Sequence, residues 1–172
     1  LQVVSPAERS TLNYLTAYPS IQHIIFTGGT DTAFHLLKNN PRCHLSAETG
    51  GKNAIILSGK GDQDHAILNA VASAFGNAGQ KCSACSLLLV EKEIYDDPAF
   101  RAKLRDATLS VQTGSVWNTE NIVGPMIDNQ NDKLMHAIEN LEKGESWLVE
   151  PEFLDEKKYI LKPCVKWGVK PG

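Results

Sequence analysis

A cysteine in a glycine-bearing stretch is the residue of this chain best suited to covalent chemistry. Residues 79–85 read Gly-Gln-Lys-Cys-Ser-Ala-Cys and precede an apolar run. A thiol on a loop beside Lys81, near the ends of a helix and a strand, lies where positive potential favours the thiolate, and a thiolate attacks carbonyl carbons. The structural alternative is that Cys82 and Cys85 are small buried hydrophobic residues, the commonest role of a free cysteine.

The spacing of Cys82 and Cys85 is also compatible with a dithiol redox motif or with part of a zinc-binding site, but the sequence around them argues against both. A dithiol redox motif should follow a strand and open a helix, whereas this pair follows an expected helix and leads into an expected strand over residues 86–90. A zinc site needs two further ligands, and Cys43 and His44 are too close together to supply them. We therefore predict no metal site, and thiol redox chemistry stays a weaker alternative.

Glu48 is the second residue with possible chemistry. It precedes two glycines in the stretch 47–53, Ala-Glu-Thr-Gly-Gly-Lys-Asn. A carboxylate that is partly shielded from water can act as a general base. The simpler interpretation is a solvated glutamate in a loop, so a role for Glu48 depends on the residues near it.

A glycine pair marks a possible phosphate-binding turn. Residues 26–30 read Phe-Thr-Gly-Gly-Thr, after an expected strand over residues 21–26 and before an expected helix over residues 31–39. Glycines at such a turn let the backbone approach a ligand, and the helix start offers unpaired N–H groups to an anion. The three-glycine dinucleotide fingerprint is not present, and a tight turn alone would also explain Gly28 and Gly29.

Alternating strands and helices along the chain predict an α/β fold. The apolar run at residues 87–90 suits a strand buried on both sides, and residues 142–158 are rich in charge and expected to be exposed. Two helices are expected in the first part of the chain: one after a Ser5 N-cap, with Leu12, Leu15 and Tyr14 on its buried face, and one over residues 31–39, with Ala33, Leu36 and Leu37. A third is expected after Asp62 or Asp64, with Ile67, Leu68, Val71 and Phe75 on its buried face. Two more are expected after Asp97-Pro98, with Phe100, Leu104 and Ala107, and after Gly124-Pro125, with Leu134, Ile138 and Leu141.

The composition is that of a globular chain with a buried core. It has 172 residues, 42% of them hydrophobic, and 17 Lys and Arg against 20 Asp and Glu, a formal net charge of −3. This balance argues against disorder and against a nucleic-acid partner. No apolar run approaches the roughly 18 residues of a membrane span, and no secretory signal is evident at the N-terminus. Four cysteines are too few for a disulfide scaffold, so reduced thiols in the cytoplasm are expected.

Taken together, the three motifs resemble those of the aldehyde dehydrogenase superfamily, and they occur in the family's order. Residues 47–54 resemble its glutamate motif and residues 75–86 resemble its cysteine motif. Residues 26–30 resemble its phosphate-side loop, usually Phe-Thr-Gly-Ser-Thr, with Gly29 in place of the serine. Gly124-Pro125 matches a later landmark of the family.

Finer features are similar to one branch of the superfamily. They are residues 46–53, residues 80–83 and the tail 166–172. The branch oxidises glutamate γ-semialdehyde, the open form of Δ1-pyrroline-5-carboxylate, and includes the aldehyde half of bifunctional proline-utilisation proteins. The resemblance therefore implies oxidation of L-glutamate γ-semialdehyde to L-glutamate.

The resemblance also implies roles for individual residues. Cys82 would add to the aldehyde carbon and pass through a thiohemiacetal and a thioester, and Glu48 would activate the water that releases the product. Ser83 would meet the carboxylate of the substrate, although a loop serine bonded to nearby backbone is an equally good interpretation. NAD would be the cofactor, and its contacts are assigned to Gly28, Gly29, Thr30 and Gly50.

The resemblance covers nearly the whole chain, while the chain covers about a third of the family's usual length. We therefore expect an aldehyde dehydrogenase-like fragment, inactive alone, with residues 1–45 as the end of the NAD-binding domain and residues 46–172 as the first part of the catalytic domain. An alternative of another class is a non-catalytic binding or assembly fragment. Surfaces that further segments would cover predict self-association or a homo-oligomer.

Overall fold

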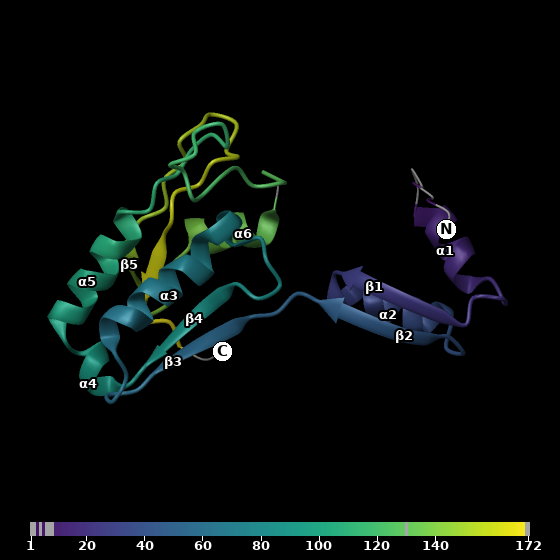
Figure 1. The fold of residues 1–172 in the computed structure, drawn as a ribbon, viewed down its shortest axis with the longest axis horizontal. Coiled ribbons are helices and arrows are strands. Elements are labelled where there is room, and N and C mark those ends of the chain that lie inside the picture. The colour runs from purple at the N-terminus through teal and green to yellow at the C-terminus, as the bar shows by residue number, and fades with distance from the viewer. Residues whose placement is uncertain (1–2, 4, 6–8, 130, 171–172) are drawn as a thin grey trace. The chain divides into compact units, whose positions relative to one another are not determined.

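The computed structural model describes residues 3, 5, 9–129 and 131–170 of the chain. These residues belong to two compact units, Leu1–Gly51 and Lys52–Gly172, whose elements are drawn in Figure 1. Each unit combines strands with helices, which confirms the α/β fold. The expected N-cap at Ser5 depends on the helix start at residues 6–8, which lies outside the described residues.

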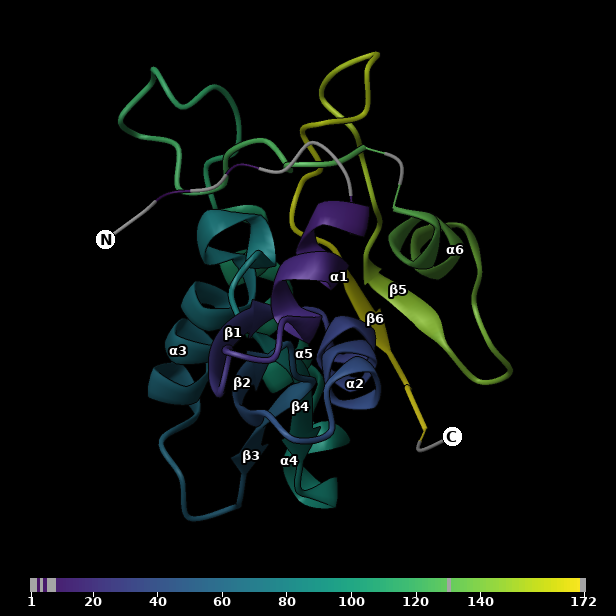
Figure 2. The same cartoon turned by 90° about the vertical axis from the view of Figure 1, so that its right-hand side faces the viewer.

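The first unit is built on two parallel strands. Helix α1 (Arg9–Ala17), strand β1 (His23–Gly28), helix α2 (Thr30–Asn39) and strand β2 (His44–Thr49) follow one another, and His23 of β1 pairs in register with His44 of β2. The side-chain amide of Asn40 donates a 2.7 Å hydrogen bond to the carbonyl of Thr16, which ties the end of α2 to α1. The strand and the helix expected on either side of the glycine pair are confirmed (Figure 2).

The prediction that the first helix buries one apolar face is wrong. Leu12, Tyr14 and Leu15 are all exposed, and Leu37 of α2 is exposed as well, while Ala33 and Leu36 are buried as expected. A two-stranded sheet offers too little surface to cover two helices. Apolar side chains at helical spacing therefore remain in contact with solvent.

The second unit contains the main hydrophobic core. Strands β3 (Asn53–Leu57) and β4 (Cys85–Val90) pair in parallel and are connected through helix α3 (Gln63–Phe75) and the short 3-10 helix η1 (Gly76–Gly79). Helices α4 (Lys92–Tyr95) and α5 (Pro98–Leu109) follow. The core contains Leu57 from β3, Ile67 and Val71 from α3, Ile94 from α4, Phe100 and Leu104 from α5, and Leu148 and Val149 from a later strand.

Local capping signals fix where the helices begin. The Asp62 carboxylate accepts a hydrogen bond from the amide of His65, and Asp97 accepts one from Ala99 with Pro98 at the first helical position. Asn131 caps helix α6 (Asp132–Glu139) in the same way. An N-cap side-chain oxygen accepts a hydrogen bond from a backbone amide of the first helical turn that would otherwise have no partner. Residue types that can do this therefore mark the start of a helix in the sequence.

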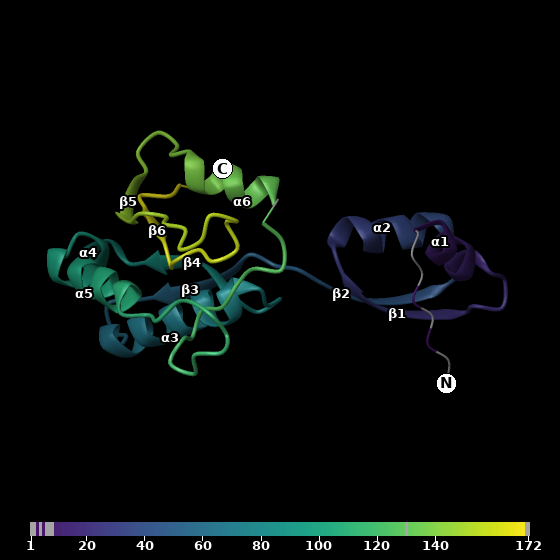
Figure 3. The same ribbon diagram turned by 90° about the horizontal axis from the view of Figure 1, so that it is seen from above.

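The C-terminal part forms an antiparallel pair, β5 (Ser146–Val149) and β6 (Val165–Trp167), shown from above in Figure 3. Most of residues 142–158 are exposed, as expected, but Leu148 and Val149 within this stretch are buried. The Trp167 ring stacks on Tyr95 with centroids 4.5 Å apart, which joins β6 to α4. Leu141 lies beyond the end of α6 and is exposed, contrary to expectation.

Strand β4 is covered on one face only, so the expectation of a strand buried on both sides is wrong. Leu87 and Leu89 of β4 and Ile56 of β3 are exposed on the face away from the core. Leu68 of α3, expected on the buried helical face, is also 66% exposed. Within the part of the chain that the structure describes, no helix has the length and apolar character needed to cross a membrane.

Candidate functional site

Cys82 lies on a turn between η1 and β4, as expected, and its side chain is exposed and free of any disulfide. The amide of Ala84 donates to the carbonyl of Lys81 at 3.2 Å and closes this turn. Just before it, Asn77, Ala78 and Gly79 all have positive φ angles, of 56°, 54° and 69°. Helix α3 has already ended at Phe75, and these three successive left-handed residues then turn the chain toward Cys82.

The backbone around Cys82 is held by Asn53, the first residue of β3. Its side-chain amide donates to the carbonyl of Cys82 at 2.7 Å and to the carbonyl of Ala84 at 3.2 Å. The pairing of β3 with β4 is irregular here, because Asn53 lies opposite Cys85 while Ala54 lies opposite Leu87. The positioning role of Asn53 was not predicted from the sequence. An asparagine at the start of a strand that pairs beside the cysteine motif is the signal that would have found it.

Gln80 holds the other side of the turn. Its side-chain oxygen accepts a 2.7 Å hydrogen bond from the amide of Ile127, and its side-chain nitrogen donates to the carbonyls of Pro125, at 3.4 Å, and Asn77, at 3.2 Å. The landmark Gly124-Pro125 is therefore brought beside the cysteine turn. This role of Gln80 was also missed, because its partners lie 45 and 47 residues away in the sequence.

Neighbours of Cys82 on the turn are exposed as well. Ser83 is exposed and adjacent to the thiol, which leaves its hydroxyl accessible to a ligand. Lys81 folds back over the end of α3, and its Nζ lies 3.4 Å from the position that a Cβ on Gly76 would take. The turn therefore presents a thiol and a hydroxyl side by side.

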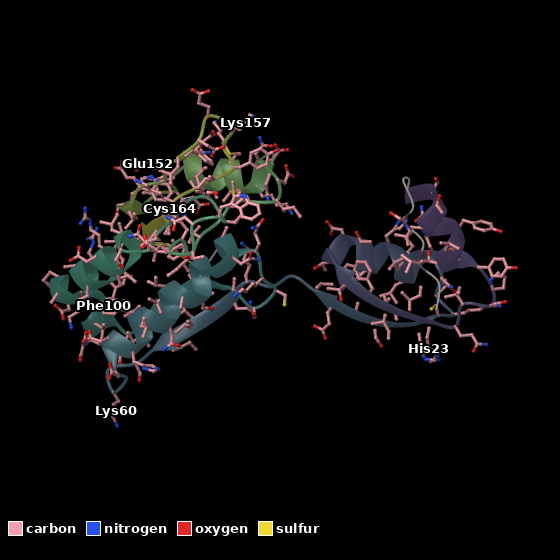
Figure 4. All side chains as sticks on the ribbon, turned by 45° about the horizontal axis from the view of Figure 1, so that its top comes forward. His23, Lys60, Phe100, Glu152, Lys157 and Cys164 are labelled. Atoms are coloured by element: carbon pink, nitrogen blue, oxygen red, sulfur yellow. The ribbon has the colours of Figure 1, made fainter. Side chains whose placement is uncertain are left out.

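The second cysteine of the motif has different surroundings. Cys85 begins β4, its amide donates to the Ser73 hydroxyl at 3.1 Å, and its thiol donates to the carbonyl of Leu87 at 3.4 Å. Cys164, labelled in Figure 4, lies just before β6, and burial raises the pKa of its thiol. Among the described residues there is no group of three or more His, Cys, Asp and Glu side chains placed to bind a metal ion.

Glu48 lies in the first unit, in strand β2, so the expectation of a loop position is wrong. It is exposed and pairs in register with Thr27 of β1, while the next pair joins Thr49 to Gly28. The glutamate motif and the glycine pair therefore meet at the carboxyl end of the same parallel strands. This end of a parallel sheet is where ligands of α/β proteins bind.

The glycine turn leaves the N-terminus of α2 open. Gly29 is the N-cap residue and no side chain caps the helix. A Cβ on Gly28 would come within 2.5 Å of the Phe26 ring, so packing explains that glycine, whereas a Cβ on Gly29 would meet only the Thr32 hydroxyl, at 4.0 Å. Nothing lies within 4 Å of a Cβ on Gly50. Uncapped amides with free space around them fit a phosphate group of a dinucleotide, although Asp31 adds negative charge in the first turn.

The chain is similar to enzymes of known activity. Over 169 residues it is 32% identical to the 1-pyrroline-5-carboxylate dehydrogenase of Geobacillus kaustophilus. This match covers 93% of this chain and 32% of the Geobacillus protein. The chain thus spans about a third of the length of the curated relatives it matches.

Solved structures share the fold. The match to Proline Utilization A from Corynebacterium freiburgense has a TM-score of 0.88 and 36% identity, over 98% of this chain and 17% of that one. A mutant of betaine aldehyde dehydrogenase from Staphylococcus aureus, in complex with NAD+, matches with a TM-score of 0.80 and 25% identity, over 90% of this chain and 32% of that one.

The resemblance seen in the sequence motifs is confirmed at the level of the family. The family model described as the aldehyde dehydrogenase family matches residues 1–172. Both the ordered motifs and the fold agree with this match. The chain belongs to the aldehyde dehydrogenase family.

Proposed function

We propose that this chain carries the nucleophile, Cys82, and the general base, Glu48, of an NAD-dependent dehydrogenase that oxidises L-glutamate γ-semialdehyde to L-glutamate. The observation that carries the proposal is an exposed thiol on a turn that Asn53 and Gln80 hold from two sides. Similarity to 1-pyrroline-5-carboxylate dehydrogenase and to Proline Utilization A supports the substrate. Similarity to an NAD+-bound aldehyde dehydrogenase supports the cofactor.

The first step is addition of the Cys82 thiolate to the aldehyde carbon. A carbon–sulfur bond forms, the carbonyl π bond breaks, and its electron pair becomes an alkoxide on the former carbonyl oxygen. The backbone N–H of Cys82 can donate to this oxyanion, and the hydrogen bonds from Asn53 to the neighbouring carbonyls fix that part of the backbone. A donor held in place before the reaction stabilises the developing charge without reorganisation.

A bound NAD would supply the hydride acceptor for this carbon, and loss of the hydride would leave a thioester on Cys82. Gly28, Gly29, Thr30 and Gly50 are the residues of this chain that would hold it, at the open start of α2 and the carboxyl end of β2. We assign residues 1–45 to the NAD-binding domain and residues 46–172 to the catalytic domain; the two compact units divide nearby, after Gly51.

Glu48 then takes a proton from water, and the resulting hydroxide attacks the thioester carbon. The carbon–sulfur bond breaks, the carboxylate product leaves, and the Cys82 thiolate is restored. The hydroxyl of Ser83 donates a hydrogen bond to the substrate carboxylate, the group that distinguishes glutamate γ-semialdehyde from simple aldehydes. All four cysteines are free thiols, and on that ground we place the enzyme in a reducing compartment, the cytoplasm.

The test uses an active full-length enzyme that carries this sequence. Cys82→Ala should reduce NADH formation from glutamate γ-semialdehyde by more than about a thousandfold, while the matched variant Cys85→Ala stays within about threefold of the parent. Ser83→Ala should raise KM for this substrate and leave KM for propanal unchanged. A Cys82→Ala variant that keeps its rate would refute the nucleophile, and faster turnover with NADP than with NAD would refute the cofactor assignment.

Self-association is the second part of the proposal. Trp117 and Ile127 are 93% and 92% exposed, and Ile25 is 90% exposed. We infer that these side chains contact a second chain, because contiguous exposed apolar patches mark protein interaction sites. Light scattering of the 172-residue chain should detect a species of at least dimer mass, and a monomer at all concentrations would contradict this part.

A further inference from the structure

Residues 152–162, between β5 and β6, form a hairpin that lies outside the sequence motifs. Two backbone hydrogen bonds close it. The Leu154 amide donates to the Ile160 carbonyl at 2.8 Å, and the Lys162 amide donates to the Glu152 carbonyl at 2.9 Å. The chain therefore reverses its direction within a few residues, and contacts inside the hairpin decide the shape of its tip.

Asp155 holds the tip of this hairpin. One oxygen of its carboxylate accepts a 2.7 Å hydrogen bond from the Ile160 amide, and the other accepts one of 3.1 Å from the Tyr159 amide. The carbonyl of Asp155 accepts from the Lys158 amide at 3.1 Å, and Lys158 has a positive φ of 58°. A residue other than glycine stays in this conformation only where its surroundings hold it. The three hydrogen bonds to Asp155 therefore fix the backbone of Tyr159.

The tip of the hairpin is bonded to the segment that follows Gly124-Pro125. The Met126 amide donates to the Tyr159 carbonyl at 2.8 Å. The side-chain amide of Asn129 donates to the carbonyl of Lys157, labelled in Figure 4, at 2.7 Å. Two backbone carbonyls of the hairpin thus hold the segment 126–129 at both of its ends.

The same segment is bonded to Gln80 of the cysteine turn. The amide of Ile127, on one side of Met126, donates to the side-chain oxygen of Gln80 at 2.7 Å. The carbonyl of Pro125, on the other side of Met126, accepts from the side-chain nitrogen of Gln80 at 3.4 Å. Gln80 lies two residues before Cys82. The position of the turn therefore depends on where the hairpin holds Met126.

We propose that the 152–162 hairpin positions the cysteine turn, and that Asp155 is a positioning residue that acts on Cys82 through Met126 and Gln80. The effect on the rate rests on the proposed role of Cys82 as nucleophile. A nucleophile and an oxyanion donor must be held in productive geometry, and a small displacement caused by a remote residue lowers the rate. Asp155 acts through the backbone and not by contact with the substrate. Its loss should therefore lower kcat and leave KM nearly unchanged.

The first test measures kcat and KM in an active full-length enzyme that carries this sequence. Asp155→Ala should lower kcat by about tenfold and keep KM within about twofold of the parent. Asp155→Asn retains an oxygen that can accept from the Ile160 amide, and it should keep kcat within about threefold of the parent. Glu156→Ala, at the exposed neighbouring residue, is the matched control and should change neither constant.

A double-mutant cycle tests the route through Gln80. In an enzyme that already carries Gln80→Ala, the connection between the hairpin and the turn is cut. Adding Asp155→Ala should then lower kcat by less than about twofold, because coupled residues have non-additive effects. A full loss on both backgrounds would show that Asp155 does not act through Gln80 and would overturn the proposal.

Hydrogen exchange in the 172-residue chain tests the mechanical link without using the activity. Asp155→Ala should speed exchange of the Met126 and Ile127 amides, and of the Ala84 amide that closes the turn, by about three- to tenfold. Glu156→Ala should leave all three unchanged. Circular dichroism checks folding. If Asp155→Ala does not fold, Asn129→Ala takes its place, because it removes the bond to Lys157 and keeps the bonds inside the hairpin.

The outcomes separate this proposal from the proposed function. Unchanged exchange at Met126, Ile127 and Ala84 would refute the link. Faster exchange with kcat unchanged in Asp155→Ala would show that the hairpin has a structural role only, and it would also overturn the proposal. A Cys82→Ala enzyme that keeps its rate would refute the nucleophile instead, while the exchange rates would still decide whether the hairpin positions the turn.

Discussion

The side chain of Asn53 bridges two carbonyl groups of the cysteine turn, those of Cys82 and Ala84, at 2.7 and 3.2 Å. Asn53 is the first residue of β3, and Cys82 is three residues before the start of β4. Parallel pairing of the two strands brings them together across 29 residues of sequence. The sheet that supports the core thus also fixes the backbone of the candidate nucleophile.

Asn53→Ala should loosen the turn. The variant loses two hydrogen bonds, and we expect the free energy of unfolding to fall by about 1–2 kcal/mol. The amide of Ala84 should exchange faster with solvent, as measured by hydrogen exchange. Asn69→Ala is the matched control, because it removes one exposed amide-to-carbonyl bond within α3. Exchange at Ala84 that is equally fast in both variants would show that Asn53 does not hold the turn.

Gln80 should control the segment that contains Gly124-Pro125. Gln80→Ala removes the acceptor for the amide of Ile127 and should speed hydrogen exchange there by about tenfold. Gln80→Glu keeps an oxygen acceptor and should preserve the protection of Ile127, although the donor to Pro125 is lost. If the two variants behave alike at Ile127, the side-chain oxygen is not what holds the segment.

Gly79 should tolerate no side chain. Its φ is +69°, and a Cβ there would come within 2.8 Å of the Ala74 carbonyl. Gly79→Ala should therefore lower the free energy of unfolding by about 2 kcal/mol or more, measured by urea denaturation. Gly50→Ala, where a Cβ meets nothing within 4 Å, should change stability by less than about 0.5 kcal/mol. Equal effects would show that neither the angle nor the contact matters.

The Glu145 carboxylate should make stability depend on pH. Hydrogen bonds from the amide of Glu142 and from Lys166 hold the pKa of Glu145 below its ordinary value of 4.5. The stabilisation is therefore present above pH 4.5 and is lost as the pH falls through the lower folded-state pKa. The side chain is only 8% exposed, which favours a measurable effect.

Urea denaturation of Glu145→Gln and of the parent at several pH values tests this. The variant should be less stable at pH 7, and the difference should shrink below about pH 4. Glu152→Gln is the control, because the ion pair of Glu152 with Lys162 is largely exposed and should contribute little. A difference for Glu145→Gln that does not vary with pH would contradict the assignment.

Features set by neighbouring residues could be predicted from the sequence. The caps at Asp62 and Asp97, the βα turn at Gly28 and Gly29, and the exposed turn at Cys82 all follow from local patterns. Their energetics involve residues only a few positions apart. The order of the motifs then indicated the family, which the comparison with known proteins confirmed.

Features that depend on distant partners could not be predicted. The burial of Leu87 and Leu89 depends on how many strands and helices cover β4, which no local pattern reports. Strand β5 was missed because its short apolar run lies within a charged stretch. The roles of Asn53 and Gln80 depend on carbonyl and amide groups 29 to 47 residues away.

The covalent intermediate on Cys82 tests the central claim most directly. A full-length enzyme with Glu48→Gln should still form the thioester but hydrolyse it slowly, because no general base activates water. Mixed with glutamate γ-semialdehyde and NAD and quenched in acid, it should show one glutamyl group per chain by mass spectrometry, located on the peptide that contains Cys82. An unmodified Cys82 during turnover, or an adduct on another cysteine, would contradict the account.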